Sequence, residues 1–191
     1  DYSGYSVSIS SSGMIVAIGA YGNDGNNNQS GHVRIYENNN GSWTQLGQDI
    51  DGEAPYDYSG HSISLSSDGN RVAIGAYQND GNSTNSGHVR IYENNNGSWN
   101  QLGQDIDGEA NYNYSGCSVS LSSNGNRLAI GAYQNDGNGS NSGHVRIYEN
   151  NNGSWTQLGQ DIDGEAYNDY SGYSVSLSSD GNRVAIGAYQ N

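Results

Sequence analysis

The sequence Ser62-Ile63-Ser64-Leu65-Ser66 alternates polar and apolar residues with a period of two, which is typical of a β-strand. Three further strand-like segments follow it along the chain: Arg71-Val72-Ala73-Ile74-Gly75-Ala76, His88-Val89-Arg90-Ile91-Tyr92-Glu93 and Ser98-Trp99-Asn100-Gln101-Leu102. The turn Asn94-Asn95-Asn96-Gly97 ends in Asn-Gly, which tolerates positive φ at both central positions of a type I′ hairpin. The longest connector, residues 77–87, joins the second and third strands. We therefore predict four short strands and no helix in this segment.

This four-strand unit recurs along the chain with a period of 56 residues. Trp43, Trp99 and Trp155 are each separated by that interval, and the second and third copies differ at only 10 of 56 positions. The chain divides into repeats 1–56, 57–112 and 113–168, followed by a partial repeat 169–191 that holds the first two strands. The sequence therefore contains about 3.4 near-copies of one unit.

Four short strands per repeat predict an all-β fold, a β-propeller built from four-stranded antiparallel blades. One blade cannot bury both of its faces, so its Val, Ile and Leu side chains need a neighbouring blade. The small residues Ala73, Gly75 and Ala76 would let adjacent sheets approach closely. Disorder is the alternative for a Gly-rich repeat, but the regular apolar alternation disfavours it. We expect the chain to be part of a larger ring or array, completed by neighbouring repeats or by other chains.

The repeats also resemble a known family. Four segments carry the likeness: Tyr58-Ser59-Gly60-His61-Ser62-Ile63-Ser64-Leu65, Asp68-Gly69, Val72-Ala73-Ile74-Gly75-Ala76-Tyr77 and Gly87-His88-Val89-Arg90-Ile91-Tyr92. These resemble the FG-GAP repeat, which builds the seven-bladed propeller of integrin α-subunits and occurs in many bacterial and algal surface proteins. The resemblance covers every repeat and implies an integrin-α-like propeller.

The chain departs from that family at positions that matter for calcium. Ser59 stands where the family has Phe before Gly, and Tyr77 stands where it has Pro after Gly-Ala. Some family blades hold Ca²⁺ in a loop of spaced acids between the first two strands. Here that loop has one carboxylate, Asp68 or Asp180, and the third repeat has Asn124 instead. Because Ca²⁺ needs about six to eight oxygen ligands, the family's site does not transfer to this loop.

Composition excludes several functional classes. The net charge is −14, and the six basic residues are all Arg and widely spaced, so we expect no nucleic-acid binding. No apolar run is long enough for membrane insertion, and no signal peptide is visible. Cys117 is the only cysteine, which excludes an internal disulfide framework.

A second acidic feature lies near the end of each repeat. In an extended strand, alternate residues share one side, so three carboxylates per repeat would gather on one face. Such a group would suit a Ca²⁺ site between blades, whereas the alternative is turn structure in which Asp accepts backbone N–H groups. We otherwise expect no cofactor to be required. The candidate metal ligands are Asp49, Asp51, Glu53, Asp105, Asp107, Glu109, Asp161, Asp163 and Glu165.

Histidines and variable positions give little support for catalysis. His32, His88 and His144 each begin the third strand, and we predict a hydrogen bond between blades for them in preference to zinc binding. His61 corresponds to Tyr5, Cys117 and Tyr173, so its position tolerates unlike chemistry. Nearly uniform repeats offer no tailored nucleophile and base. We predict that the chain is not an enzyme; a hydrolase would require turnover of some substrate.

Seven Asn-x-Ser/Thr sequons fall in predicted surface turns. They are candidates for N-glycosylation, and the alternative is that Asn/Gly/Ser-rich turns create the motif by chance. Together with the absence of Lys, they suit an extracellular or cell-surface protein. The candidate acceptors are Asn28, Asn40, Asn82, Asn96, Asn113, Asn138 and Asn152.

These observations favour a non-enzymatic structural or adhesive module of a large extracellular or cell-surface protein, assembling into a fibre or surface layer and presenting polar loops to protein or glycan ligands. The alternative is a ligand-binding propeller, lectin-like or Ca²⁺-dependent, with one shallow site per blade. In that case the ligand-stacking rings would be Tyr21, Tyr77, Tyr133, Trp43, Trp99 and Trp155.

Overall fold

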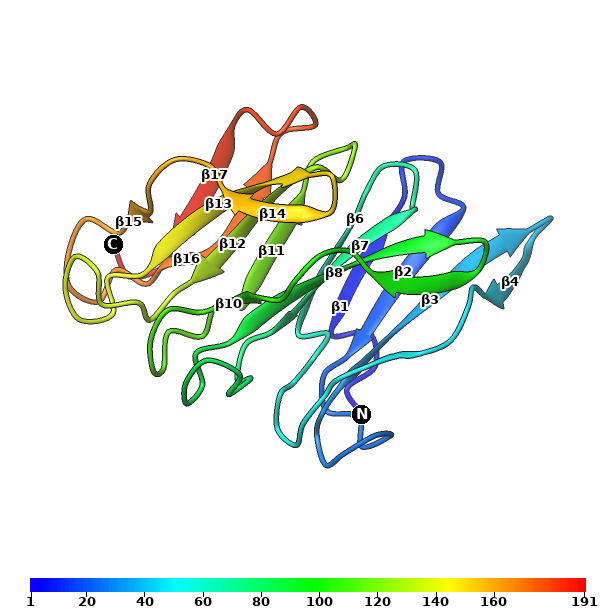
Figure 1. The fold of residues 1–191 in the computed structure, drawn as a ribbon, viewed down its shortest axis with the longest axis horizontal. Coiled ribbons are helices and arrows are strands. Elements are labelled where there is room, and N and C mark those ends of the chain that lie inside the picture. The colour runs from blue at the N-terminus through cyan, green and yellow to red at the C-terminus, as the bar shows by residue number, and fades with distance from the viewer.

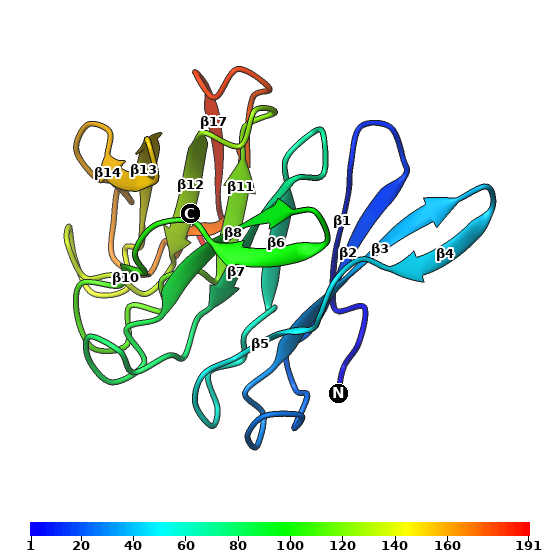
Figure 2. The ribbon, with the colours of Figure 1, turned by 45° about the vertical axis from the view of Figure 1, so that its right-hand side comes forward.

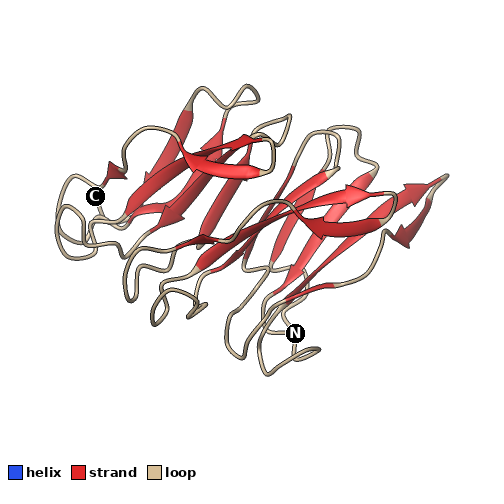
Figure 3. Cartoon of the chain, viewed as in Figure 1, coloured by secondary structure: helices blue, strands red, loops and turns tan.

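The computed structural model describes residues 1–191 as an all-β chain without helices (Figure 3), as the sequence predicts. The first repeat contains β1 Ser6–Ile9, β2 Ile15–Ala20, β3 His32–Asn39, β4 Ser42–Gln45 and β5 Ile50–Asp51. The second contains β6 Ser62–Leu65, β7 Arg71–Ala76, β8 His88–Asn95, β9 Ser98–Gln101 and β10 Ile106–Asp107. The third contains β11 Ser118–Leu121, β12 Arg127–Ala132, β13 His144–Asn151, β14 Ser154–Gln157 and β15 Ile162–Asp163, and β16 Ser171–Leu177 and β17 Val184–Ala188 follow.

Each full repeat folds into one antiparallel sheet. Its first four strands pair in chain order, for example β11, β12, β13 and β14 in the third repeat, and β16 and β17 form a separate two-stranded sheet. The predicted type I′ turn is present between β8 and β9, where Asn96 and Gly97 have φ of 53° and 87°. No helix has the length and apolarity needed to cross a bilayer.

One strand per repeat escapes prediction from the sequence. The third strand is long enough for two partners on its outer edge, so that β9 pairs with the second half of β8 while β10 pairs with its first two residues. A two-residue strand has no periodicity to detect, which is why the pattern alone missed it. The chain thereby returns along the outer edge of the sheet toward the start of β8 before it enters the next repeat.

The sheets stand side by side like the blades of a fan (Figures 1 and 2), with the first strands β1, β6, β11 and β16 in contact with one another. The apolar core lies between sheets. One cluster joins Val33 and Ile35 of the first repeat to Ile63 and Leu65 of the second. A second cluster joins the second and third repeats in the same way. Each sheet thus buries its apolar residues only against the next copy.

Close approach of the sheets depends on glycine and serine. A Cβ on Gly75 would lie 2.0 Å from the carbonyl oxygen of Gly116 in the next repeat, so no larger residue fits. The hydroxyl of Ser62 donates to that same carbonyl at 2.7 Å, and the hydroxyl of Ser64 accepts from the backbone N–H of Leu121 at 2.9 Å. The polar positions of the alternating strand therefore bond to the neighbouring sheet.

Candidate functional site

Two of the three tryptophans, Trp99 and Trp155, lie in the boundaries between repeats. The indole Nε1 of Trp99 donates to the Leu46 carbonyl at 2.8 Å, and that of Trp155 donates to the Leu102 carbonyl at 2.9 Å. Trp99 and Trp155 are 4% and 3% exposed, whereas Trp43 is 47% exposed. The two buried indoles are therefore unavailable as stacking platforms for a ligand, and they serve to join the repeats.

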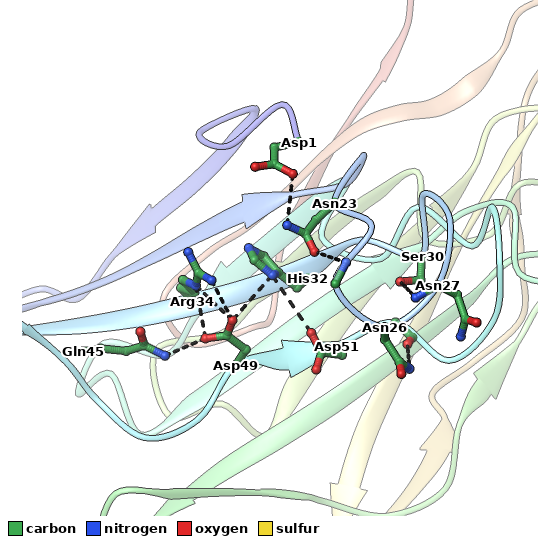
Figure 4. A network of polar contacts seen from close by, with 12 residues as sticks. Asp1, Asn23, Asn26, Asn27, Ser30, His32, Arg34, Gln45, Asp49 and Asp51 are labelled. Carbon is green, nitrogen blue, oxygen red and sulfur yellow. Dashed lines mark hydrogen bonds and ion pairs between the residues drawn. The ribbon is translucent and has the colours of Figure 1, made fainter.

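The first acidic residue of each triplet lies beside the histidine that begins the third strand. In the first repeat, Asp49 accepts hydrogen bonds from Arg34 and from Gln45, as Figure 4 shows. Its Oδ2 lies 3.6 Å from His32 Nδ1, and Asp51 Oδ1 lies 4.0 Å from the same nitrogen. Equivalent Asp–His distances are 3.7 Å for Asp105–His88 and 3.5 Å for Asp161–His144.

The glutamate of each triplet reaches into the following repeat. Glu53 Oε1 lies 3.0 Å from Arg90 Nη1, and Glu109 Oε1 lies 3.5 Å from Arg146 Nη1. Arg146 also donates to the backbone carbonyl of Asp107 at 2.8 Å. Both arginine side chains are buried, whereas their glutamate partners, Glu53 and Glu109, remain about half exposed at 51% and 47%.

The structure therefore divides the acidic triplets instead of gathering them. Three groups of potential ligands form, and within each group the ligand atoms lie within 4.8 Å of one another. The groups are His32, Asp49 and Asp51; Glu53, His88 and Asp105; and Glu109, His144 and Asp161. Asp107, Asp163 and Glu165 join none of them. The expectation that three carboxylates of one triplet share a face was wrong, because the connector turns after its second acid and carries the glutamate to the next repeat.

The predicted hydrogen bonds from the histidines to a neighbouring blade are also not found. His88 Nε2 and His144 Nδ1 are buried without a hydrogen-bond partner. Burial, together with Arg146, lowers the pKa of His144 to about 4, so this histidine is neutral at pH 7. The hydrogen bond from Arg34 lowers the pKa of Asp49 despite partial burial. Each cluster thus combines an imidazole with one carboxylate that already faces an arginine, namely Asp49, Glu53 or Glu109.

These arrangements fit calcium poorly. Each cluster offers two carboxylates and an imidazole, whereas Ca²⁺ takes about six to eight oxygen ligands. In the loop between the first two strands, Asp68 accepts from Ser66 and from both the backbone and side chain of Asn70. Its carboxylate is therefore occupied in closing the turn. The acidic residues serve turn and ion-pair structure at both places.

The sequons differ in accessibility. Asn113 is 4% exposed, and its Oδ1 accepts from Asn135 Nδ2 and from the backbone N–H of Ala110, so it cannot be a glycosylation acceptor in the folded chain. Asn82 and Asn138 are exposed, but each donates its amide to a backbone carbonyl, and Asn28 donates to Tyr56. The hairpin positions Asn40, Asn96 and Asn152 are exposed at the tips of the third hairpins.

Comparison with known families agrees with this organisation. Residues 50–92 and 105–148 match the FG-GAP repeat. Both of these segments are FG-GAP-like repeats. No curated protein sequence matches it.

Solved structures similar to this chain support the propeller fold. A protein named as a 6-phosphogluconolactonase from Bacteroides uniformis superposes with a TM-score of 0.61 at 13% identity, covering 95% of this chain and 46% of that one. A second protein of that name, from Bacteroides fragilis, gives 0.58 at 15% identity and covers 94% and 40%. The hydrazine synthase of Kuenenia stuttgartiensis gives 0.56 at 14% identity and covers 96% and 58%. The array therefore spans about half of these chains, and identities this low show the fold alone.

Proposed function

We propose that this chain is a non-enzymatic structural or adhesive module of a large extracellular or cell-surface protein, and that its two end faces dock further FG-GAP-like repeats. The observation that carries the proposal is the exposure of apolar residues whose copies are buried inside the array. Ile162 is 39% exposed, whereas the equivalent Ile106 is 4% exposed. At the other end, Trp43 is 47% exposed, whereas the equivalent Trp99 is 4% exposed.

The two end faces are complementary to each other. The face of the first repeat presents Val7, Ile9 and Trp43, and the face beyond the third sheet presents Leu158 and Ile162. Within the chain, the equivalent residues of neighbouring repeats pack together, and the tryptophan bonds to the carbonyl of the equivalent leucine. A repeat of the same sequence is therefore the partner that both faces fit, and head-to-tail contact of this kind gives either a closed ring or a fibre.

The uniformity of the repeats supports a scaffold over an enzyme. The histidines, arginines and carboxylates recur in each boundary and contact one another, so no single repeat holds a distinct catalytic set. We propose that the module needs no metal. The exposed hairpin sequons and the absence of Lys support an extracellular setting.

Sedimentation velocity over a range of concentrations tests the docking faces. The chain should associate, and Trp43→Ser should weaken association at least about tenfold, because a buried aromatic anchor dominates such interfaces. Asn100→Thr, which introduces the residue of the third repeat on an exposed strand, is the matched control. A chain that stays monomeric at all concentrations, or a Trp43→Ser variant that associates like the wild type, would overturn the proposal.

Two further assays separate the functional classes. No hydrolysis of 6-phosphogluconolactone is expected, although similar folds bear that name, and turnover would show an enzyme. A glycan array distinguishes a scaffold from a lectin-like propeller, because saturable binding of one sugar class would favour the lectin.

A further inference from the structure

A row of tyrosines crosses all four repeats. It lies beside the start of the first strand of each repeat, such as β6 and β11. Neighbouring rings have centroids 5.0–6.1 Å apart, which is the range of attractive aromatic pairs. The row consists of Tyr2, Tyr21, Tyr58, Tyr77, Tyr114, Tyr133, Tyr170 and Tyr189. It alternates between a residue just before the first strand and a residue just after the second strand of each repeat.

Every repeat holds one member of this row in an unfavourable backbone conformation. Tyr2, Tyr58, Tyr114 and Tyr170 have φ between 53° and 55°, the left-handed region that bulky residues rarely adopt. Such strain persists only where the surroundings fix it, and it is common at binding sites. The strained backbone places each of these rings against the tyrosine that follows the second strand.

A cavity of about 320 Å³ opens beside this row. It is lined by Tyr5, His61, Tyr77, Cys117, Tyr133 and Tyr173. Four of these belong to one repeat position, which is Tyr in the first and fourth repeats but His61 and Cys117 in the middle two. The smaller side chains leave the hollow, because a tyrosine at those two positions would occupy it. The variable position therefore gives the otherwise uniform array a cavity with a distinctive lining.

The walls of the cavity are aromatic and uncharged. Tyr173 meets Tyr133 at 86° and His61 meets Tyr77 at 46°, so the rings form walls at angles to one another. Burial raises the pKa of Cys117 to about 11 and that of Tyr77 to about 12, and burial lowers the pKa of His61. At pH 7 these groups carry no charge. The buried thiol is thus neither a nucleophile nor a metal ligand.

We propose that this aromatic cavity binds a quaternary or methylated ammonium group. The faces of several aromatic rings attract a diffuse cation, and such cages recognise choline and methylated lysine. No cationic side chain lines the cavity, and the net charge of −14 draws cations toward the molecule. The volume is near the lower limit for ligand pockets, which suits a small group.

Calorimetric titration with choline tests the proposal against 3,3-dimethyl-1-butanol, its uncharged carbon isostere. Choline should bind at least about tenfold more tightly than the isostere, because the cation–π attraction is lost with the charge. Phosphocholine and a trimethyllysine peptide, as further arms, identify the source as a lipid headgroup or a protein side chain. Equal binding of choline and the isostere, binding of sugars alone, or no binding of any of these probes would overturn the proposal.

Variants taken from the chain's own repeats locate the site. Cys117→Tyr introduces the residue of the first and fourth repeats, so it should fold normally and abolish binding by filling the hollow. Cys117→Ser keeps the volume and should bind choline within about twofold of the wild type. Melting temperatures confirm folding of both variants. Choline binding that survives Cys117→Tyr in a folded protein would overturn the assignment, and this result is independent of whether the end faces associate.

Discussion

The indole of Trp99 is held by the carbonyl of Leu46, a residue of the preceding repeat, through a 2.8 Å hydrogen bond. The contact runs in both directions, because Gln48 of that preceding repeat donates its side-chain amide to the carbonyl of Trp99 at 3.2 Å. Backbone and side chains of consecutive repeats are thus joined at the outer edge of the blades, while Ile63 and Leu65 join them further in.

Replacing this indole should destabilise the array far more than the same change one repeat earlier. Trp99→Ala should cost about 3–5 kcal/mol, because it empties a buried aromatic site and removes the indole donor. Trp43→Ala, at the equivalent position but half exposed, should cost less than about 1 kcal/mol. Urea denaturation followed by circular dichroism measures both. Equal losses for the two variants would contradict the boundary role of Trp99.

The free energy of unfolding should decrease as the solution becomes more acidic, because of the buried histidines. The pKa of His144 is about 4 in the folded chain, below its ordinary value of 6.5, so the unfolded chain takes up a proton first as the pH falls. Stability is therefore fully present above pH 6.5 and is lost between 6.5 and about 4, by roughly 3 kcal/mol for this residue. Arg146 favours the neutral form, whereas Asp161 opposes it.

The test compares urea midpoints at pH 7 and pH 4.5 for wild type and His144→Gln. The variant should lose less stability between the two pH values, since it has no imidazole to protonate. An unchanged difference would mean that carboxylates alone determine the pH dependence.

Calcium should have little effect on the folded chain. Glu53 already faces Arg90 and Asp49 already faces Arg34. A calcium ion would have to break these ion pairs, and it would gain only a few of the oxygen ligands that it needs. Calorimetric titration with CaCl₂ should give no heat of binding, and the melting temperature should not rise. A rise that disappears in Glu53→Gln with Asp105→Asn would instead show that the Glu53–His88–Asp105 group binds the ion.

Glycosylation should follow exposure and not the motif alone. When the chain is expressed through a eukaryotic secretory pathway, Asn40, Asn96 and Asn152 should carry glycans, because they lie exposed at hairpin tips. Asn113 should remain unmodified, because it is buried and bonded to Asn135. Peptide mass spectrometry after enzymatic deglycosylation measures occupancy at each site. A glycan on Asn113 of folded protein would contradict the packing around it.

The blades could be predicted from the sequence because their pattern is local. Alternation over Ser62–Leu65 and the Asn96-Gly97 turn fix strands and hairpin within a few residues, and the 56-residue period copies that result along the chain. The small residue Gly75 likewise indicated close packing of sheets, which the approach to Gly116 confirms. Interactions with an adjacent residue or an adjacent copy are thus visible in the pattern.

The candidate sites could not be predicted in the same way, because they depend on where a connector turns between two sheets. Glu109 is two residues from Asp107 in sequence, yet it pairs with Arg146 of the next repeat. Asn113 lies in a polar turn by composition but is covered when the turn folds against Asn135. The hollow beside Cys117 arises because that side chain is smaller than Tyr5 and Tyr173 at the equivalent positions. These residues come together only when the first strands of the repeats lie side by side.

The close approach of neighbouring sheets can be tested by enlarging the glycine at the point of contact. Gly75→Ala should destabilise the array by about 1–3 kcal/mol, because the added methyl meets the Gly116 carbonyl at 2.0 Å and neither backbone can withdraw without opening the core between sheets. Gly187 is its equivalent in the last sheet. There an added Cβ meets only the Ser174 side chain within 3.0 Å, and that hydroxyl can rotate away. Gly187→Ala should therefore be nearly neutral in urea denaturation. Since the two glycines share local sequence and strand position, equal destabilisation would mean that intrinsic strand effects, and not the neighbouring blade, require glycine at this position.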